Sequence, residues 1–297
     1  MKGKKKIALA LCLILCLGCF VPQGVLAAKR PHLSKTEITV QTGRTKKLKV
    51  LNNKKKVTWT SKRKSIATVT KQGRVRGIAP GTTKITAKVG GKKYVCVVHV
   101  KFSAKYARKH IKIRYVKTPR SVVAYITNNN RFPLWYNKCA MHYYDANNHE
   151  LKTNTSPYHA MGSLCAPVKK TVVVEFMYPS KNLDYFEPHS YKIELKIKPS
   201  IYKDLSRKIK ITKSVADGKA SVTVKNIGKK TIKTIRVSAV LYGADGTIYD
   251  VVERHFTFLH GLKPGESKTE EYGKPLINSQ YIDIARVEAY ADYVYSD

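Results

Sequence analysis

Acidic residues are scarce in this chain of 297 residues, which has 19 Asp and Glu against 57 Lys and Arg and a formal net charge of +38. In the first two thirds the carboxylates are too few for the paired acids of a glycosidase. No phosphate-binding loop, nucleophile elbow or zinc-protease helix occurs, and the nine His are scattered. We therefore expect no enzyme: no catalytic, cofactor-binding or metal-ligating residues, and no cofactor.

Long apolar runs are also missing, except at the N-terminus, which excludes a polytopic membrane protein. There, a basic segment precedes an apolar run from Ile7 to Val21, Pro22 ends the run, and Ala27 and Ala28 provide small residues for cleavage. This pattern predicts a secretory signal peptide over residues 1–28 and a mature chain without a transmembrane span. An uncleaved anchor is one alternative. Lipid attachment at Cys19 is another, although Cys16 stands where the lipoprotein motif has Leu.

Cysteine is rare in the expected mature chain. Three of the six Cys leave with the leader, so that Cys96, Cys139 and Cys165 remain. An odd number cannot form a closed disulfide framework. Cys139 and Cys165 can form one disulfide or be two buried thiols, and the sequence leaves both open.

What the chain does contain is short runs in which apolar and polar residues alternate, separated by turn residues. In residues 33–101, Val57 alternates with Trp59, and Tyr94, Cys96 and Val98 share one phase. Alternation with Gly-bearing turns at this spacing predicts a β-sandwich. We expect Trp59 to fill the centre of its core and Cys96 to face inward.

Residues 33–101 also carry a family resemblance. The segments Trp59-Thr60-Ser61, Ile66-Ala67-Thr68-Val69, Gly73-Arg74-Val75-Arg76-Gly77 and Gly81-Thr82-Thr83-Lys84-Ile85-Thr86-Ala87 follow one another in this order, after the opening Leu33-Ser34-Lys35-Thr36. In this order they resemble the bacterial immunoglobulin-like (Ig-like) group 2 family. The resemblance implies a small Ig-like sandwich of secreted and surface proteins, adhesins included, and no catalytic residues.

The positive charge is concentrated in the same region. Residues 29–101 have 21 Lys and Arg and one acid, Glu37. The net charge is +20 there, +10 over residues 102–200 and +4 over residues 201–297. Nine basic residues fall between core positions or in turns and are the candidate polyanion-binding residues: Lys46, Lys47, Lys49, Lys54, Lys55, Lys56, Lys62, Arg63 and Lys64. A basic surface without a dedicated partner is the alternative.

The remainder of the chain repeats itself at an offset of 98 residues: Asn128 corresponds to Asn226, and Tyr144 to Tyr242. A register shared over this length indicates duplication of one module. The pattern of strands and turns resembles bacterial extracellular Ig-like modules with an FxLYD-type pattern. We therefore expect an all-β chain of tandem Ig-like β-sandwich modules after the leader. The expected units are residues 33–101 (the first module), 107–200 (the first repeat) and 205–297 (the second repeat).

Aromatic residues are dense in the first repeat. Phe132, Trp135 and Tyr136 are expected in a turn region between two strands, where aromatic side chains can stack on sugar rings. The alternative is that they fill the core, as bulky aromatics do in a chain with 19 Tyr.

Together these features predict a non-catalytic secreted or cell-surface protein, extracellular and associated with the cell wall. Its expected partners are an anionic cell-wall polymer or polysaccharide, bound by the first module, and other surface proteins. Nucleic acid is not expected as a partner because the leader directs the chain outward. The alternative function is a carbohydrate- or protein-binding adhesin module that uses the aromatics of the first repeat.

Overall fold

The computed structural model describes the chain except for residues 1–29, 156–163, 179–187, 202, 278 and 296–297. The expected leader, with Cys19, lies outside the described residues. The described part is built almost entirely from β-strands, with a short helix α2 (Ala104–Arg108) and a 3-10 turn η3 (Ser206–Lys208). The predicted all-β fold class is confirmed. No described helix has the length and apolar character needed to cross a membrane.

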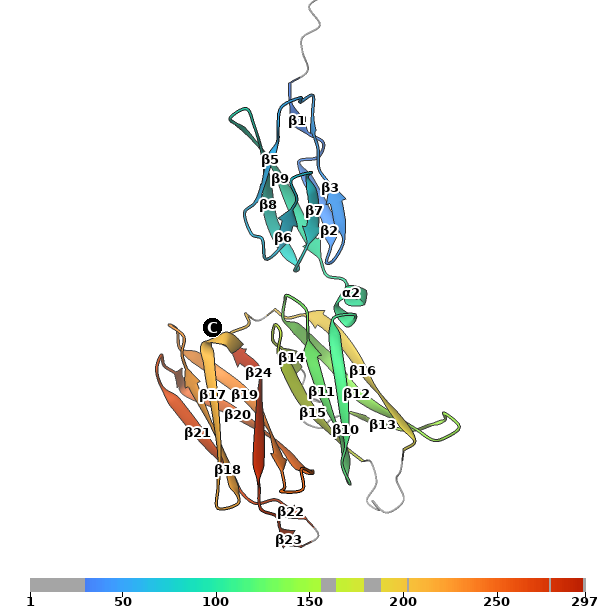
Figure 1. Ribbon diagram of the computed structural model, residues 1–297, viewed down its shortest axis with the longest axis vertical. Helices are drawn as coiled ribbons and strands as arrows, with labels where there is room; N and C mark the ends of the chain where they lie inside the picture. Colours follow the sequence, from blue (N-terminus) through green and yellow to red (C-terminus); the bar gives the residue numbers. More distant parts are fainter. Residues whose placement is uncertain (1–29, 156–163, 179–187, 202, 278, 296–297) are drawn as a thin grey trace, which may run out of the picture.

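The first module is a sandwich of two sheets (Figure 1). One sheet has the order β2-β9-β8-β5, the other β3-β7-β6, and β1 pairs with β4. The strands are β1 (His32–Leu33), β2 (Glu37–Gln41), β3 (Thr45–Lys47), β4 (Val50–Leu51), β5 (Thr58–Ser61), β6 (Ala67–Val69), β7 (Arg74–Gly77), β8 (Gly81–Val89) and β9 (Lys92–Lys101). Side chains from both sheets, including Val75, Ile85 and Cys96, form its buried core, as the alternation predicts.

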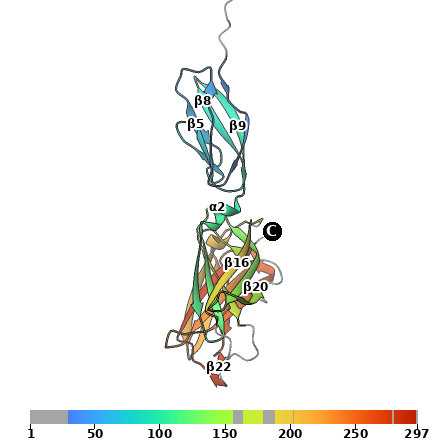
Figure 2. The same ribbon diagram turned by 90° about the vertical axis from the view of Figure 1, so that its right-hand side faces the viewer.

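Helix α2 connects the first module to the first repeat (Figure 2). Ser103 caps the helix, since its hydroxyl accepts a hydrogen bond from the N–H of Tyr106 at 3.3 Å. Ala107 is fully buried in the core of the first repeat, and Phe102 packs against the same core. The connection is therefore anchored in the first repeat.

The two repeats have the same succession of strands. The first repeat has β10 (Ile111–Lys117), β11 (Ser121–Asn128), β12 (Leu134–Tyr144), β13 (Glu150–Thr155), β14 (Leu164–Ala166), β15 (Thr171–Met177) and β16 (Ser190–Pro199). The second has β17 (Ile209–Ala216), β18 (Lys219–Asn226), β19 (Ile232–Tyr242), β20 (Ile248–Leu262), β21 (Ser267–Tyr272), the hairpin β22 (Leu276–Ile277) and β23 (Gln280–Tyr281), and β24 (Arg286–Tyr295). Sheet β10-β11-β15 faces β12 with β13, β14 and β16; sheet β17-β18-β21 faces β20-β19-β24.

One buried amide performs the same task in both repeats. Asn128 and Asn226 are fully buried. Each donates from Nδ2 to the backbone carbonyl four residues downstream, at 3.1 Å and 2.9 Å respectively. Each also accepts a backbone N–H at Oδ1 from the residue two positions on. A buried amide is stable only when its polar atoms are satisfied, so this position fixes the same turn twice.

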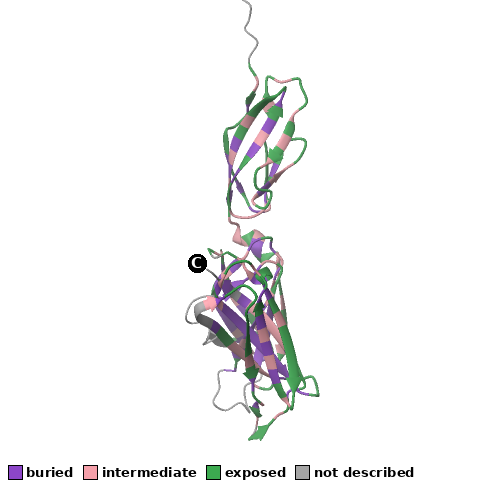
Figure 3. Cartoon of the chain, turned by 90° about the vertical axis from the view of Figure 1, so that its left-hand side faces the viewer, coloured by how far each residue is buried: buried purple, intermediate pink, exposed green. Residues whose placement is uncertain are grey.

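The repeats are joined face to face by a hydrophobic core of their own. Tyr125 and Val173 of the first repeat pack there against Val240, Tyr242 and Ile248 of the second. The hydroxyls of Tyr125 and Tyr242 are 2.8 Å apart and hydrogen-bonded. The four sheets consequently form a stack of layers, and the strands inside it are buried on both faces (Figure 3).

The outer faces of this stack are polar. At the offset of 98 residues, Ser221 and Thr223 stand on the outer face of the second repeat where the first has the interface residues Val123 and Tyr125. Likewise, His142 stands where the second repeat has the interface residue Val240. Polar outer faces end a stack of repeats because they have no apolar surface to bury. The contact between repeats is therefore made once within the chain.

An ion pair is also repeated at this offset. Lys138 Nζ lies 2.7 Å from Glu194 in the first repeat, with side chains 38% and 35% exposed. In the second repeat Arg236 binds Asp292 through two hydrogen bonds of 2.7 and 2.6 Å, with side chains 7% and 1% exposed. The ion pair at this position is thus half-exposed in the first repeat and buried in the second.

The two ion pairs predict very different costs of mutation. Asp292→Asn leaves the Arg236 guanidinium buried without its bidentate partner and should lower the free energy of unfolding by about 3–5 kcal/mol. The matched change Glu194→Gln affects a half-exposed pair and should cost about 0–1 kcal/mol. Urea unfolding of both variants measures the difference. Equal losses would show that the buried pair is not structurally decisive.

Candidate functional site

The cations of the first module have almost no carboxylate to pair with. Residues 30–101 contain 20 Lys and Arg, and their one acid is Glu37. Its Oε1 lies 2.8 Å from Nε2 of His99. Among the described residues, no Lys or Arg of this segment forms an ion pair. The positive charge of this segment is therefore not neutralised by ion pairs with described carboxylates.

All nine candidate polyanion-binding residues are exposed, as expected from their positions. Lys54, Lys55 and Lys56 precede β5, whereas Lys62, Arg63 and Lys64 follow it. These two clusters lie at opposite ends of one strand, so the nine residues do not form a single patch. Their role in binding stays a prediction.

The strand register adds Arg74, Lys88 and Lys93 to the nine candidate cations. Arg74 lies directly opposite the candidate Lys47 in the β3–β7 pair, and Lys88 lies directly opposite Lys93 in the β8–β9 hairpin. All four residues are exposed. Like charges directly opposite each other destabilise a sheet. A bound polyanion would relieve this repulsion, which makes the two pairs part of the candidate site.

Trp59 does not lie at the centre of the core, where the sequence predicts it. It lies on β5, the edge strand of its sheet, and is half-buried. Its side chain has the inward phase and packs against the core. Because an edge strand has no neighbour on one side, the indole also lines a cavity of about 660 Å³.

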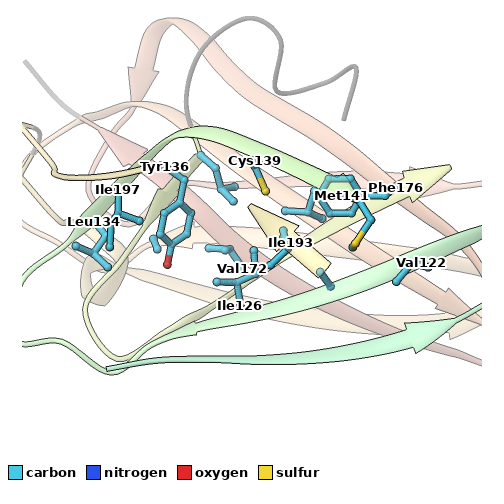
Figure 4. Packing of buried hydrophobic residues seen from close by; sticks show 14 of the residues in the cluster. Val122, Ile126, Leu134, Tyr136, Cys139, Met141, Val172, Phe176, Ile193 and Ile197 are labelled. Carbon is cyan, nitrogen blue, oxygen red and sulfur yellow. The ribbon is translucent and has the colours of Figure 1, made fainter. Parts of the chain in front are cut away.

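The prediction that three aromatic residues of the first repeat stack on a ligand is wrong for two of them. Phe132 and Tyr136 are 5% and 2% exposed and belong to the core, where Tyr136 packs beside Leu134 and Ile197 (Figure 4). Tyr136 and Trp135 are part of β12, so their side chains alternate and Trp135 is half-buried on the other phase. Phe132 and Tyr136 therefore fill the core, which is the alternative that the sequence left open.

A second cavity, of about 570 Å³, lies beside the outer face of the first repeat. His142 is held there between two carboxylates, 2.8 Å from Glu150 and 3.4 Å from Glu194. The described residues contain no group of three His, Cys, Asp or Glu that could hold a metal ion. His142 and these two carboxylates pair with one another, which explains their arrangement.

The three Cys in the described part of the chain are buried free thiols, so Cys139 and Cys165 do not form a disulfide. Burial raises the pKa of Cys139 to about 12, and it is the main reason why the pKa values of Cys96 and Cys165 rise to about 11. A thiol protonated at neutral pH is a poor nucleophile. These residues act as small core side chains.

Comparison with known proteins identifies the first module. Residues 27–98 match the family model of the bacterial Ig-like domain (group 2). The resemblance stated from the sequence is confirmed for this segment. The FxLYD-type resemblance of the two repeats stays a prediction.

Similarity beyond this family is weak. No curated protein matches the chain. Among solved structures, domains 5–6 of the S-layer protein SbsC are similar at 15% identity with a TM-score of 0.21, over 76% of this chain and 96% of that one. Red sea bream transglutaminase is similar at 11% identity with a TM-score of 0.18, over 76% of this chain and 38% of the enzyme.

The like-charge pair in the β8–β9 hairpin gives a prediction about stability and binding together. Lys88→Glu replaces repulsion with attraction to Lys93 and should stabilise the hairpin by about 0.2–1 kcal/mol, while it weakens polyanion binding. Native-state hydrogen exchange of the β8 and β9 amides measures the first effect. Lys62→Glu is the control, because it changes the net charge equally in a loop. Equal protection in the two variants would contradict the prediction.

Proposed function

We propose that this chain is a non-catalytic, exported surface protein whose first module binds an anionic polymer of the cell envelope. The observation that supports the proposal is the near absence of carboxylates in residues 30–101, where 20 Lys and Arg accompany Glu37 alone. The match to the bacterial Ig-like domain supports a surface-type module.

Electrostatics favours an extended polyanion over a small anion as the partner. The exposed cations lie on separate segments of the module, so a polymer can contact several of them along its length, whereas a small anion reaches only a few. Each contact releases counterions condensed on the polymer, and the affinity therefore falls steeply with salt. The sequence pattern of the leader sends the chain outward, which favours teichoic-acid-like wall polymer or acidic polysaccharide over nucleic acid.

The repeats are suited to act as a rigid spacer. Their net charges of +10 and +4 are smaller, and their cations include Lys138 and Arg236, which bind carboxylates. The interface core between them, with the Tyr125–Tyr242 hydrogen bond, holds them in one arrangement. In this proposal they carry the first module away from the point at which the chain is retained.

The proposal predicts that binding of the full chain to isolated Gram-positive cell walls weakens steeply as ionic strength rises. Cosedimentation over a salt series measures it. Walls from which the anionic polymer has been removed should bind little protein even at low salt. Binding that is unchanged at high salt would overturn the proposal.

A matched pair of variants assigns the binding to the first module. One variant replaces Lys47, Arg74, Lys88 and Lys93 with Gln; the other replaces Lys210, Lys213, Lys225 and Lys229, which are exposed in the second repeat. Both remove four charges. The first variant should lose affinity for walls and the second should keep it. Equal losses would mean that net charge alone, and not the first module, determines binding.

A further inference from the structure

The cavity beside Trp59 lies in the most cationic part of the chain. Its volume of about 660 Å³ is in the range of sites for small ligands. It is bounded by the segment from Leu48 to Val50, by the start of β5, and by the turn between β6 and β7. Its lining residues are Leu48, Lys49, Val50, Lys56, Val57, Thr58, Trp59, Lys71 and Gln72.

The turn between β6 and β7 fixes the indole of Trp59. Gly73 has a φ of 76°, and a Cβ at this position would lie 3.0 Å from the Trp59 ring and 2.4 Å from the backbone oxygen of Leu48. Only glycine allows the backbone to approach this closely at this φ. The ring is therefore held in place before any ligand arrives. No described residue forms a hydrogen bond with the indole N–H, so it is available to a ligand.

Three lysines line the same cavity as the ring. Lys49, Lys56 and Lys71 line the cavity, and all three residues are exposed. No carboxylate lines it, and none of the three forms an ion pair with a described residue. The cavity thus combines a fixed aromatic surface with uncompensated positive charge.

We propose that this cavity binds one anionic pyranose unit, a sugar ring with a carboxylate or phosphate substituent. The apolar face of a pyranose packs on an aromatic ring, and its anionic group pairs with the lysines. This inference rests on the proposed function, because such units occur within an anionic envelope polymer. It goes further by giving the first module a recognition site in addition to its general attraction for polyanions.

The test separates sugar recognition from charge. Trp59 and Trp135 are the two Trp of the chain, so Trp135→Phe in the full-length protein leaves Trp59 as the fluorescent reporter. The probes are hexagalacturonate, which has anionic pyranose rings, inorganic polyphosphate, which has charge without rings, and maltohexaose, which has rings without charge. The emission of Trp59 should change saturably with hexagalacturonate, and not with polyphosphate or maltohexaose.

Two triple variants in this background complete the experiment. One replaces Lys49, Lys56 and Lys71 with Gln; the control replaces Lys84, Lys88 and Lys93, which are exposed on β8 and β9. The cavity variant should lose about tenfold more affinity for hexagalacturonate than the control, while both lose polyphosphate affinity equally.

The outcomes distinguish this site from the proposed function. Equal losses of hexagalacturonate affinity, or binding of polyphosphate without binding of hexagalacturonate, would overturn the sugar site and leave the proposed function standing. Failure of the parent protein to bind either anion would overturn both. Circular dichroism of each variant verifies that the sandwich is intact.

Discussion

A β-sandwich can contain 20 cations and a single carboxylate only if every cation reaches water. This constraint determines the first module. In β8 the residues alternate, so that the apolar phase forms the core and the other phase carries Lys and Thr. Where the register places Lys88 against Lys93, the hairpin tolerates repulsion that the core must offset. The proposed binding of an anionic polymer would relieve this repulsion.

The two repeats have the same kind of fold as the first module, but each must also bury apolar residues on the outside of its sandwich. Apolar residues on one face of each repeat require cover, and the two faces cover each other. Arg236 and Asp292 become buried in the second repeat, while the corresponding Lys138 and Glu194 stay half-exposed. A desolvated pair is sensitive to the loss of one partner, whereas a hydrated pair is not. Ion pairs at equivalent positions of the two repeats therefore differ in their energetic roles, in line with their different burial.

The sequence predicts features that depend on neighbouring residues, and it does not predict features that depend on residues far apart in the chain. Alternation is local, and it correctly predicts the all-β class, the inward phase of Cys96 and the exposure of the nine basic residues. Strand register is not local, so the opposition of Lys47 and Arg74 could not be predicted. Trp59 has the predicted phase, but its half-burial follows from the edge position of β5, which depends on sheet order. The interface between the repeats could be predicted from the sequence, because Val240 and His142 differ in polarity at equivalent positions.

Hydrogen exchange of the full chain with and without a soluble anionic wall polymer tests the central claim most directly. The account predicts that the polymer slows exchange within residues 30–101 and leaves the strands of the second repeat, residues 209–295, unchanged. Protection confined to the repeats, or spread evenly over the chain, would contradict it.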